Sequence, residues 1–239
     1  YTGGRLRLFD GVDRSEFINL LKAKIMRREW IAKEGGRCLT LFFNGWGMDE
    51  RAVQHLAGTG DVLMFYDYRD IAGEEAPRTE GYEEVRVVAW SMGVWAASVL
   101  LSRWALHVDY RVAINGTERP VDECYGIQLK VYLLTERGMD ERGRNKFFAR
   151  MLAGKEEMVK FEANKPRREL NEQVEELRVI REQSGLIRPE IRWNKAYVFA
   201  GDVIFPAENQ RNWWNGRCEV VNLEGGHYPF YVLDNWEII

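Results

Sequence analysis

The chain has few cysteines and few histidines, three of each among 239 residues. Cys38, Cys124 and Cys218 are widely spaced and odd in number, so they indicate neither a disulfide framework nor a zinc site. We interpret them as reduced thiols, which are typical of a cytoplasmic protein. No stretch approaches the roughly 20 apolar residues of a membrane-spanning helix, and no apolar run behind a basic start resembles a signal peptide. We therefore expect no membrane partner.

An excess of basic charge is also missing. The chain carries 34 Lys and Arg residues against 37 Asp and Glu residues, a formal net charge of -3 at pH 7. It therefore lacks the overall positive field that attracts nucleic acid, and we expect no nucleic-acid partner, although a local patch stays open. Hydrophobic residues make up 46% of the sequence, enough for one sizeable core in a chain of this length.

The first 25 residues are set apart from the rest. Residues 13–25 have the pattern of a short amphipathic helix, with Asp13 and Glu16 in capping-box spacing. Met26 then opens a Met-Arg-Arg sequence that is itself a natural start. We divide the chain into residues 1–25, an N-terminal tail or short helix, and residues 26–239, the main domain.

Short apolar runs alternate with helical patterns through the main domain. The runs are rich in Val, Ile, Phe and Tyr, which is typical of buried strands, and a helix over residues 92–104 follows the third of them. This alternation predicts an α/β fold with a mostly parallel central sheet flanked by helices on both faces. The predicted strands cover residues 38–43, 62–66, 85–89, 110–114, 196–200 and 218–222.

The strand signal nearly vanishes over residues 116–190. Two stretches there, residues 144–152 and 168–182, are helical and amphipathic, with Gly154 and Gly185 as expected ends. Loops at the carboxyl ends of parallel strands surround the ligand crevice of an open α/β sheet. We therefore predict a helical insertion that acts as a lid.

A candidate nucleophile lies where a β-rich run meets a helical pattern. The segment V-V-A-W-S-M-G, residues 87–93, resembles the G-x-S-x-G nucleophile elbow of the α/β-hydrolases, with Ala89 in place of the first glycine. Such a turn exposes the Ser91 oxygen and presents helix N–H groups to a developing oxyanion. The alternative is that Ser91 only caps an ordinary helix, because serine is a preferred cap.

The segment F-F-N-G-W-G, residues 42–47, follows the first predicted strand. It resembles the H-G-x-G oxyanion loop of the same superfamily, with Asn44 at the position of the usual histidine. The resemblance implies that the backbone N–H groups of Trp46 and Met92 form the oxyanion hole.

The segment F-A-G-D-V-I-F-P, residues 199–206, offers a candidate acid. It resembles the G-x-x-D-x-x-V-P segment that supplies the triad acid, which makes Asp202 the candidate. The alternative is a turn aspartate that caps the following helix.

The candidate base is His227, in the glycine-bearing loop G-G-H-Y-P-F after the last predicted strand. We expect His55 in a surface helix and His107 in a connection, and the spacing of the three histidines supports no metal site. The order Ser91, Asp202, His227 is the order that α/β-hydrolases use. In this arrangement His227 takes the serine proton during attack on an ester, while Asp202 orients the imidazole, and no cofactor is needed.

Three segments taken together are more specific. N-G-W-G-M-D at residues 44–49, A-W-S-M-G at residues 89–93 and N-G-T-E-R-P-V-D at residues 115–122 look like the BioG type of pimeloyl-[acyl-carrier protein] methyl ester esterase, formerly a family of unknown function. The resemblance covers about residues 26–236. It implies a serine carboxylesterase that removes the methyl ester from pimeloyl-[acyl-carrier protein] in biotin precursor synthesis. Trp46 and Trp90 would then flank the acyl chain, unless they are plain core aromatics.

The predicted lid is locally basic. An acyl-carrier protein is acidic, so complementary charge on the lid would speed its docking. The alternative is an ordinary set of solvated helix faces. The basic residues that make it so, all within residues 137–168, are Arg137, Arg142, Arg144, Lys146, Arg150, Lys155, Lys160, Lys165, Arg167 and Arg168.

Two other functions stay open, because a triad defines the reaction class but hardly the substrate. One is a carboxylesterase or thioesterase that acts on a small acyl ester without a carrier. The other is a non-catalytic protein of the hydrolase fold that binds a ligand or partner.

Overall fold

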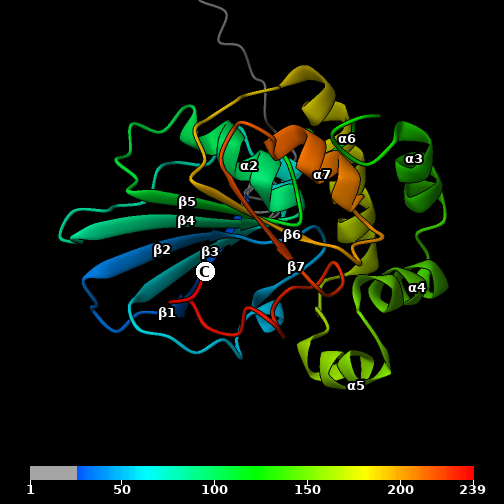
Figure 1. The fold of residues 1–239 in the computed structure, drawn as a ribbon, viewed down its shortest axis with the longest axis horizontal. Coiled ribbons are helices and arrows are strands. Elements are labelled where there is room, and N and C mark those ends of the chain that lie inside the picture. Colours follow the sequence, from blue (N-terminus) through cyan, green and yellow to red (C-terminus); the bar gives the residue numbers. More distant parts are fainter. Residues whose placement is uncertain (1–25) are drawn as a thin grey trace, which may run out of the picture.

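The computed structural model describes residues 26–239, so the helix predicted over residues 13–25 lies outside the described residues. Seven strands form one sheet in the order β1-β3-β2-β4-β5-β6-β7 (Figure 1). All neighbouring strands are parallel except β1, which is antiparallel to β3. The strands are β1 Arg27–Ala32, β2 Cys38–Phe43, β3 Asp61–Tyr66, β4 Glu84–Trp90, β5 Tyr110–Ile114, β6 Lys195–Phe199 and β7 Glu219–Leu223.

The predicted fold class is confirmed, and six of the seven strands lie where the apolar runs indicated, with ends shifted by at most one residue. All six residues of β3 are buried, which is why the run reads as continuously apolar. The strand that we did not predict is β1, whose first four residues are exposed. It lies at the edge of the sheet, where charged residues are favoured because they discourage pairing with another chain.

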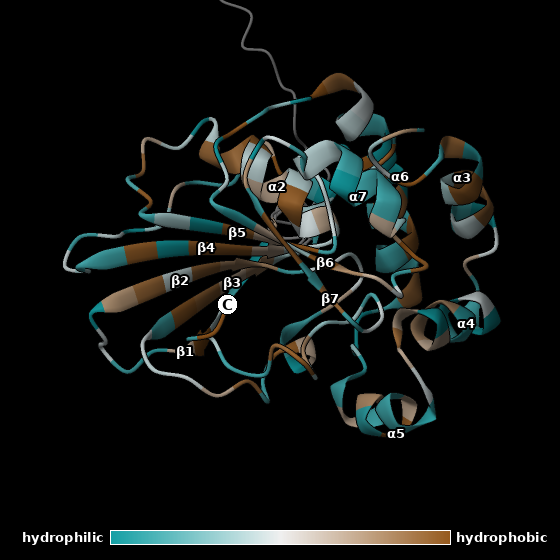
Figure 2. Cartoon of the chain, viewed as in Figure 1, coloured by the Kyte–Doolittle hydropathy of each residue, from teal (hydrophilic) through white to brown (hydrophobic). Residues whose placement is uncertain are grey.

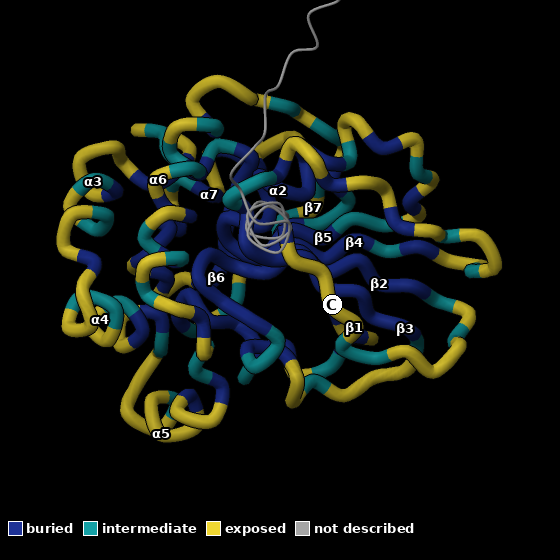
Figure 3. The backbone as a smooth tube through the Cα atoms, turned by 180° about the vertical axis from the view of Figure 1, so that it is seen from behind, coloured by how far each residue is buried: buried dark blue, intermediate teal, exposed yellow. Residues whose placement is uncertain are grey.

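Different segments cover the two faces of the sheet. Phe42 and Phe43 are consecutive on β2 and so point to opposite faces. Phe43 contacts Trp104, just after helix α2 (Met92–Leu101), whereas Phe42 contacts Phe230 and Trp236 of the C-terminal segment. Helix α7 (Ala207–Trp214) packs against β6 and β7. Figure 2 shows the hydrophobic strands at the centre, and Figure 3 shows their burial from behind.

The segment between β5 and β6 forms a helical insertion with four helices, α3 (Leu129–Arg137), α4 (Glu141–Met151), α5 (Lys155–Asn164) and α6 (Leu170–Leu186). Figure 1 shows α3, α4 and α5 gathered beyond one end of the sheet. Only α4 and α6 had been predicted. Gly154 is the residue before α5 rather than the end of a helix, and Gly185 lies inside α6.

Three local predictions need correction. The helix predicted over residues 92–104 ends at Leu101, and Trp104 lies in the connection. His55 is in a turn after a short 3-10 helix rather than in a surface helix, and its Nε2 lies 2.9 Å from the Phe230 carbonyl. None of the helices described for residues 26–239 has the length and apolar character that a membrane crossing requires.

Candidate active site

Ser91 occupies a strained turn between β4 and α2. Its φ of 58° and ψ of -124° lie outside the conformations that L-residues usually adopt. Two glycines leave room for this turn, because a Cβ on Gly93 would lie 2.2 Å from the Phe43 carbonyl oxygen and a Cβ on Gly116 would lie 2.3 Å from the Ser91 carbonyl oxygen. The Ser91 side chain makes no capping hydrogen bond to α2, so the helix-cap alternative is wrong.

Ser91, His227 and Asp202 form one hydrogen-bonded chain. His227 Nε2 lies 2.9 Å from Ser91 Oγ, and His227 Nδ1 lies 2.8 Å from Asp202 Oδ2. All three side chains are buried, with residue exposures of 2–5%. The structure therefore brings together three residues that stand up to 136 positions apart in the sequence.

The carboxylate of Asp202 has two separate roles in this geometry. Its Oδ1 accepts hydrogen bonds from the backbone N–H groups of Ile204 and Phe205, each at 2.9 Å, which holds the turn before α7. Its Oδ2 faces His227 and also accepts a hydrogen bond from Gln210 Nε2 at 2.9 Å. Asp202 therefore holds a turn through one oxygen but caps no helix, because α7 begins at Ala207 after Pro206 and has no side-chain cap. The other oxygen is committed to the histidine.

The loop that carries His227 is held through its backbone. The His227 carbonyl oxygen accepts hydrogen bonds from Asn115 Nδ2 and Trp90 Nε1, both at 3.0 Å. Asn115 also donates to the Gly226 carbonyl and accepts from the Phe199 N–H, so it ties the loop to the end of β6. Asn115 begins the segment N-G-T-E-R-P-V-D, but we predicted no role for it, although its position directly after β5 and before Gly116 was a usable signal.

The predicted oxyanion loop runs from Asn44 to Met48. The Asn44 side chain accepts from the Gly45 N–H and donates to the Asp49 carbonyl, both at 2.9 Å, so the asparagine braces the loop from within. Within residues 26–239, the backbone N–H groups of Trp46 and Met92 have no hydrogen-bond acceptor. Both residues line the same pocket as Ser91. Two unpaired donors therefore lie beside the serine.

The pocket above Ser91 is mostly apolar, and the insertion supplies one wall of it. That wall includes Val131 from α3, Phe147 and Met151 from α4 and Leu177 from α6. Arg150 is the one permanently charged residue among the described residues that line the pocket. An apolar pocket with few polar groups suits an acyl chain.

Trp46 and Trp90 both line this pocket and are also nearly buried, with exposures of 4% and 1%. Each indole N–H is already paired: Trp46 Nε1 donates to the Gln173 carbonyl at 2.8 Å, and Trp90 Nε1 donates to the His227 carbonyl. The pocket-wall and core interpretations therefore both describe these residues.

The ten basic residues within residues 137–168 of the insertion do not share one environment. Arg168 is buried and paired with Asp67 and Glu176, so it is unavailable to a partner, contrary to our interpretation. Arg144 and Lys165 are half-buried. The exposed ones are Arg137, Arg142, Lys146, Arg150, Lys155, Lys160 and Arg167.

One family model and two similar proteins were found for this chain. A family model described as pimeloyl-ACP methyl esterase BioG matches residues 26–239. A Bacteroides fragilis protein named malonyl-[acyl-carrier protein] O-methyltransferase is 38% identical over 196 residues, which make up 81% of this chain but only 40% of that protein. A Haemophilus influenzae protein named only as uncharacterized is 33% identical over 208 residues, covering 85% of this chain and 94% of that protein.

Solved structures extend the comparison. The crystal structure of BioG from Haemophilus influenzae gives a TM-score of 0.82 at 32% identity, and the match covers 89% of this chain and 99% of that chain. An esterase from Exiguobacterium antarcticum gives a TM-score of 0.61 at 17% identity, covering 87% of this chain and 90% of the other. At that identity the second match supports the fold alone.

Proposed function

The chain belongs to the BioG family of pimeloyl-ACP methyl esterases, and on that premise we propose that it is a serine carboxylesterase that hydrolyses the methyl ester of pimeloyl-[acyl-carrier protein]. The observation that carries the proposal is the unbroken hydrogen-bonded chain from Ser91 through His227 to Asp202, at 2.9 and 2.8 Å. A non-catalytic binding protein has no need of a buried chain of this kind beneath an apolar pocket.

The chemistry follows from the positions of the atoms. His227 Nε2 removes the Ser91 proton as Oγ attacks the ester carbonyl carbon, and Asp202 holds the imidazole in the tautomer that can accept it. The carbonyl oxygen becomes an oxyanion, which the Trp46 and Met92 N–H groups stabilise by about 3 kcal/mol per donor. The intermediate collapses, and methanol leaves with the proton from His227. Water, activated by His227, then releases the free carboxylate and restores Ser91.

The pocket supports an acyl substrate presented from the insertion side. The pimeloyl methylene groups suit the apolar wall formed by α3, α4 and α6. The far end of the acyl chain, joined to the carrier, would leave the pocket near the insertion, which carries seven exposed basic residues within residues 137–168. We infer that residues 116–190 act as a lid and that this face receives an acidic carrier protein. The division at residue 25 and a cytoplasmic location stay predictions.

Hydrolysis of pimeloyl-carrier methyl ester by the intact chain, compared with Ser91→Ala, tests the proposal. Mass spectrometry should show loss of the methyl group with the wild-type chain, and the rate should fall at least about a thousandfold in the variant. An active Ser91→Ala variant would overturn the serine mechanism. Cleavage of carrier-free esters alone, dependent on Ser91, would instead point to an esterase without a carrier.

A further inference from the structure

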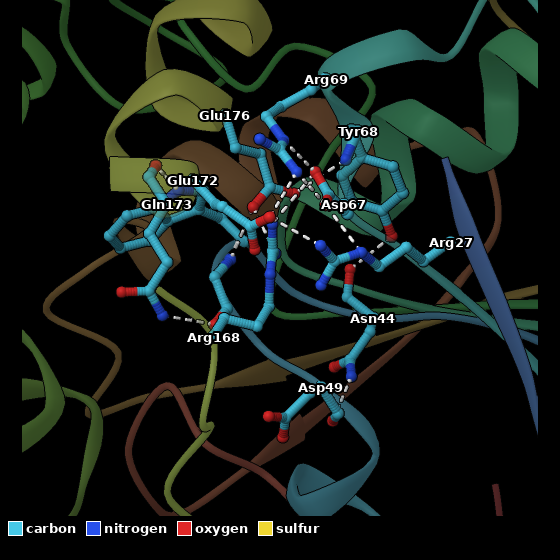
Figure 4. Close-up of polar contacts among 12 residues, drawn as sticks. Arg27, Asn44, Asp49, Asp67, Tyr68, Arg69, Arg168, Glu172, Gln173 and Glu176 are labelled. Atoms are coloured by element: carbon cyan, nitrogen blue, oxygen red, sulfur yellow. Dashed lines mark hydrogen bonds and ion pairs between the residues drawn. The ribbon is translucent and has the colours of Figure 1, made fainter. Parts of the chain in front are cut away.

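A buried ionic cluster joins the insertion to the sheet, outside the Ser91 chain. Figure 4 shows its centre, where Arg168 lies between two carboxylates. Arg168 Nη1 pairs with Glu176 Oε2 at 2.6 Å, and Arg168 Nη2 pairs with Asp67 Oδ1 at 3.0 Å. The three side chains are at most 2% exposed. Buried charges are costly unless they are paired and hydrogen-bonded, so the arrangement calls for an explanation.

The Glu176 carboxylate reaches the oxyanion loop. Its Oε2 accepts the Gly47 N–H at 3.1 Å and its Oε1 accepts the Tyr68 N–H at 2.9 Å. Burial, together with the nearby Asp67 carboxylate, raises the pKa of Glu176 above its ordinary value, and Arg168 and the hydrogen bond from the Tyr68 N–H oppose this rise. Arg168 thus favours the charged form, which accepts both backbone hydrogen bonds at once.

One turn earlier on α6, Gln173 holds the other side of the same peptide segment. Gln173 Nε2 donates to the Gly47 carbonyl at 2.7 Å, and the Gln173 carbonyl accepts the Trp46 indole N–H at 2.8 Å. Both backbone groups of Gly47 and the side chain of Trp46 are therefore bound to α6. Helix α6 belongs to the insertion, so the loop depends on a segment far away in the sequence.

These contacts matter because the loop has little stiffness of its own. Gly45 and Gly47 flank Trp46, and Gly47 has a φ of +72°, in the region that favours glycine. Peptide groups beside glycine rotate readily, and an oxyanion donor acts only when it is directed at the oxyanion in advance. Within the loop, Asn44 binds the Gly45 N–H and the Asp49 carbonyl, and the Met48 N–H donates to the Gly45 carbonyl at 3.3 Å. The N–H and carbonyl groups of Gly47, directly after Trp46, are instead bound by α6.

We propose that Glu176 and Gln173 are positioning residues for the oxyanion hole, so that the insertion is part of the catalytic scaffold as well as the wall of the pocket. The inference rests on the proposed serine mechanism, in which the Trp46 N–H is an oxyanion donor. Arg168 and Asp67 support the arrangement by stabilising the Glu176 carboxylate.

The test uses Glu176→Gln, which keeps the shape of the side chain but leaves one backbone N–H without an acceptor. Gln173→Met serves as a second variant that leaves the ionic cluster intact. The matched control is Glu182→Gln on the same helix, whose carboxylate is exposed and pairs with Arg178. A fluorophosphonate reacts once with each active serine, so titration to its end point counts the folded, competent active sites. Each kcat is then calculated per active site.

Two measurements distinguish a positioning role of α6 from a purely stabilising role. Both follow hydrolysis of a carrier-free short-chain ester. The first measurement asks whether the variants change kcat or KM. The second is the affinity for a trifluoromethyl ketone inhibitor. Ser91 Oγ adds to the carbonyl carbon of this ketone while His227 takes the serine proton, and the ketone oxygen becomes an oxyanion in the hole. We expect kcat per titrated site to fall about tenfold to a hundredfold in Glu176→Gln and less in Gln173→Met, below the loss of a whole donor. Ketone affinity should fall in parallel, with KM changed less than about twofold.

Wild-type kcat per titrated site and wild-type ketone affinity in the two variants would overturn the inference. If Glu176→Gln does not fold, Gln173→Met decides by the same readouts. Ser91→Ala distinguishes this failure from failure of the serine mechanism, because an active Ser91→Ala chain would refute the mechanism itself. An inactive Ser91→Ala chain beside unimpaired positioning variants would refute only the role of α6.

Discussion

The Asp202 carboxylate depends on a helix residue that no motif marks. Gln210 lies on α7, is fully buried, and donates from Nε2 to Asp202 Oδ2 at 2.9 Å and to the Phe205 carbonyl at 2.7 Å. One side chain therefore fixes both the carboxylate and the turn that presents it. The bond to Asp202 is charge-assisted and removed from water, which makes it stronger than an ordinary surface hydrogen bond.

Replacement of Gln210 by Met should lower kcat by about threefold to tenfold with little change in KM, because hydrogen bonds to charged groups contribute about 1.5–3 kcal/mol and only part of this acts on the reaction. Methionine has a similar length, so the helix should still pack. Steady-state kinetics on a carrier-free ester, together with a thermal unfolding curve, measures both effects. Glu208→Gln, on an exposed position of the same helix, is the control. A wild-type kcat in Gln210→Met would show that Asp202 needs no such support.

Sequence patterns could identify Ser91, Asp202 and His227 because each stands where a strand ends in a glycine-bearing loop. Gln210 lacks any such mark, since it belongs to the polar stretch A-E-N-Q-R-N-W-W that reads as an ordinary surface helix. Its burial is decided by where α7 packs, which depends on contacts distant in sequence. The same reason hid Glu176 and Gln173, whose partners in the oxyanion loop lie more than 100 residues earlier.

At the start of β3, Asp61 organises the turn between β1 and β2. Its Oδ1 accepts the N–H groups of Glu34, Gly35 and Gly36 at 2.8–3.2 Å, and its Oδ2 accepts the Tyr82 hydroxyl at 2.6 Å. Burial alone would raise the pKa of Asp61, but these four hydrogen bonds hold it below its ordinary value. The carboxylate therefore contributes stability to the edge of the sheet.

This contribution should disappear in acid. A group whose folded pKa is lowered stabilises the protein fully above its unfolded pKa, about 3.9 for aspartate, and loses the effect as the pH falls through the folded value. Asp61→Asn should therefore be less stable than wild type by about 1–2 kcal/mol near pH 7. The difference should shrink below about pH 4.

Urea unfolding of both chains at a series of pH values measures this difference. Glu80→Gln, at an exposed position before β4, controls for the loss of one negative charge. A difference between wild type and Asp61→Asn that stays constant down to pH 3 would contradict the role of the charge.

The strands were predictable where both faces of the sheet are buried along most of the strand. Strands β2 to β6 are mostly buried, and their sequences are apolar runs with a few polar or charged residues toward their amino ends. Strand β1, with the sequence R-R-E-W-I-A, lacks that signal because its charged residues face solvent. Helix α3 also escaped prediction, since Leu129, Val131 and Leu134 are exposed and blur the division into an apolar and a polar face.

Charge is distributed unevenly over the whole chain. The net charge is -3, yet residues 137–168 of the insertion, beyond the end of the sheet that carries the pocket, hold seven exposed basic residues against four exposed acidic ones. Long-range attraction depends on this local field rather than on the total charge. An acidic carrier protein would approach the side of the molecule from which the pocket is reached, and a small neutral ester would not respond to the field.

The rate with the carrier-bound ester should therefore depend on salt, whereas the rate with a carrier-free ester should not. Raising the NaCl concentration from about 0.05 M to about 0.5 M shortens the Debye length to a few ångströms, so kcat/KM for the carrier-bound methyl ester should fall about tenfold. For a carrier-free ester kcat/KM should change less than about twofold. Arg142→Glu on α4 should lower kcat/KM for the carrier substrate alone, whereas Arg78→Glu, exposed in the loop before β4, should leave it unchanged. Equal salt dependence for both substrates would mean that the basic residues are only solvated helix faces.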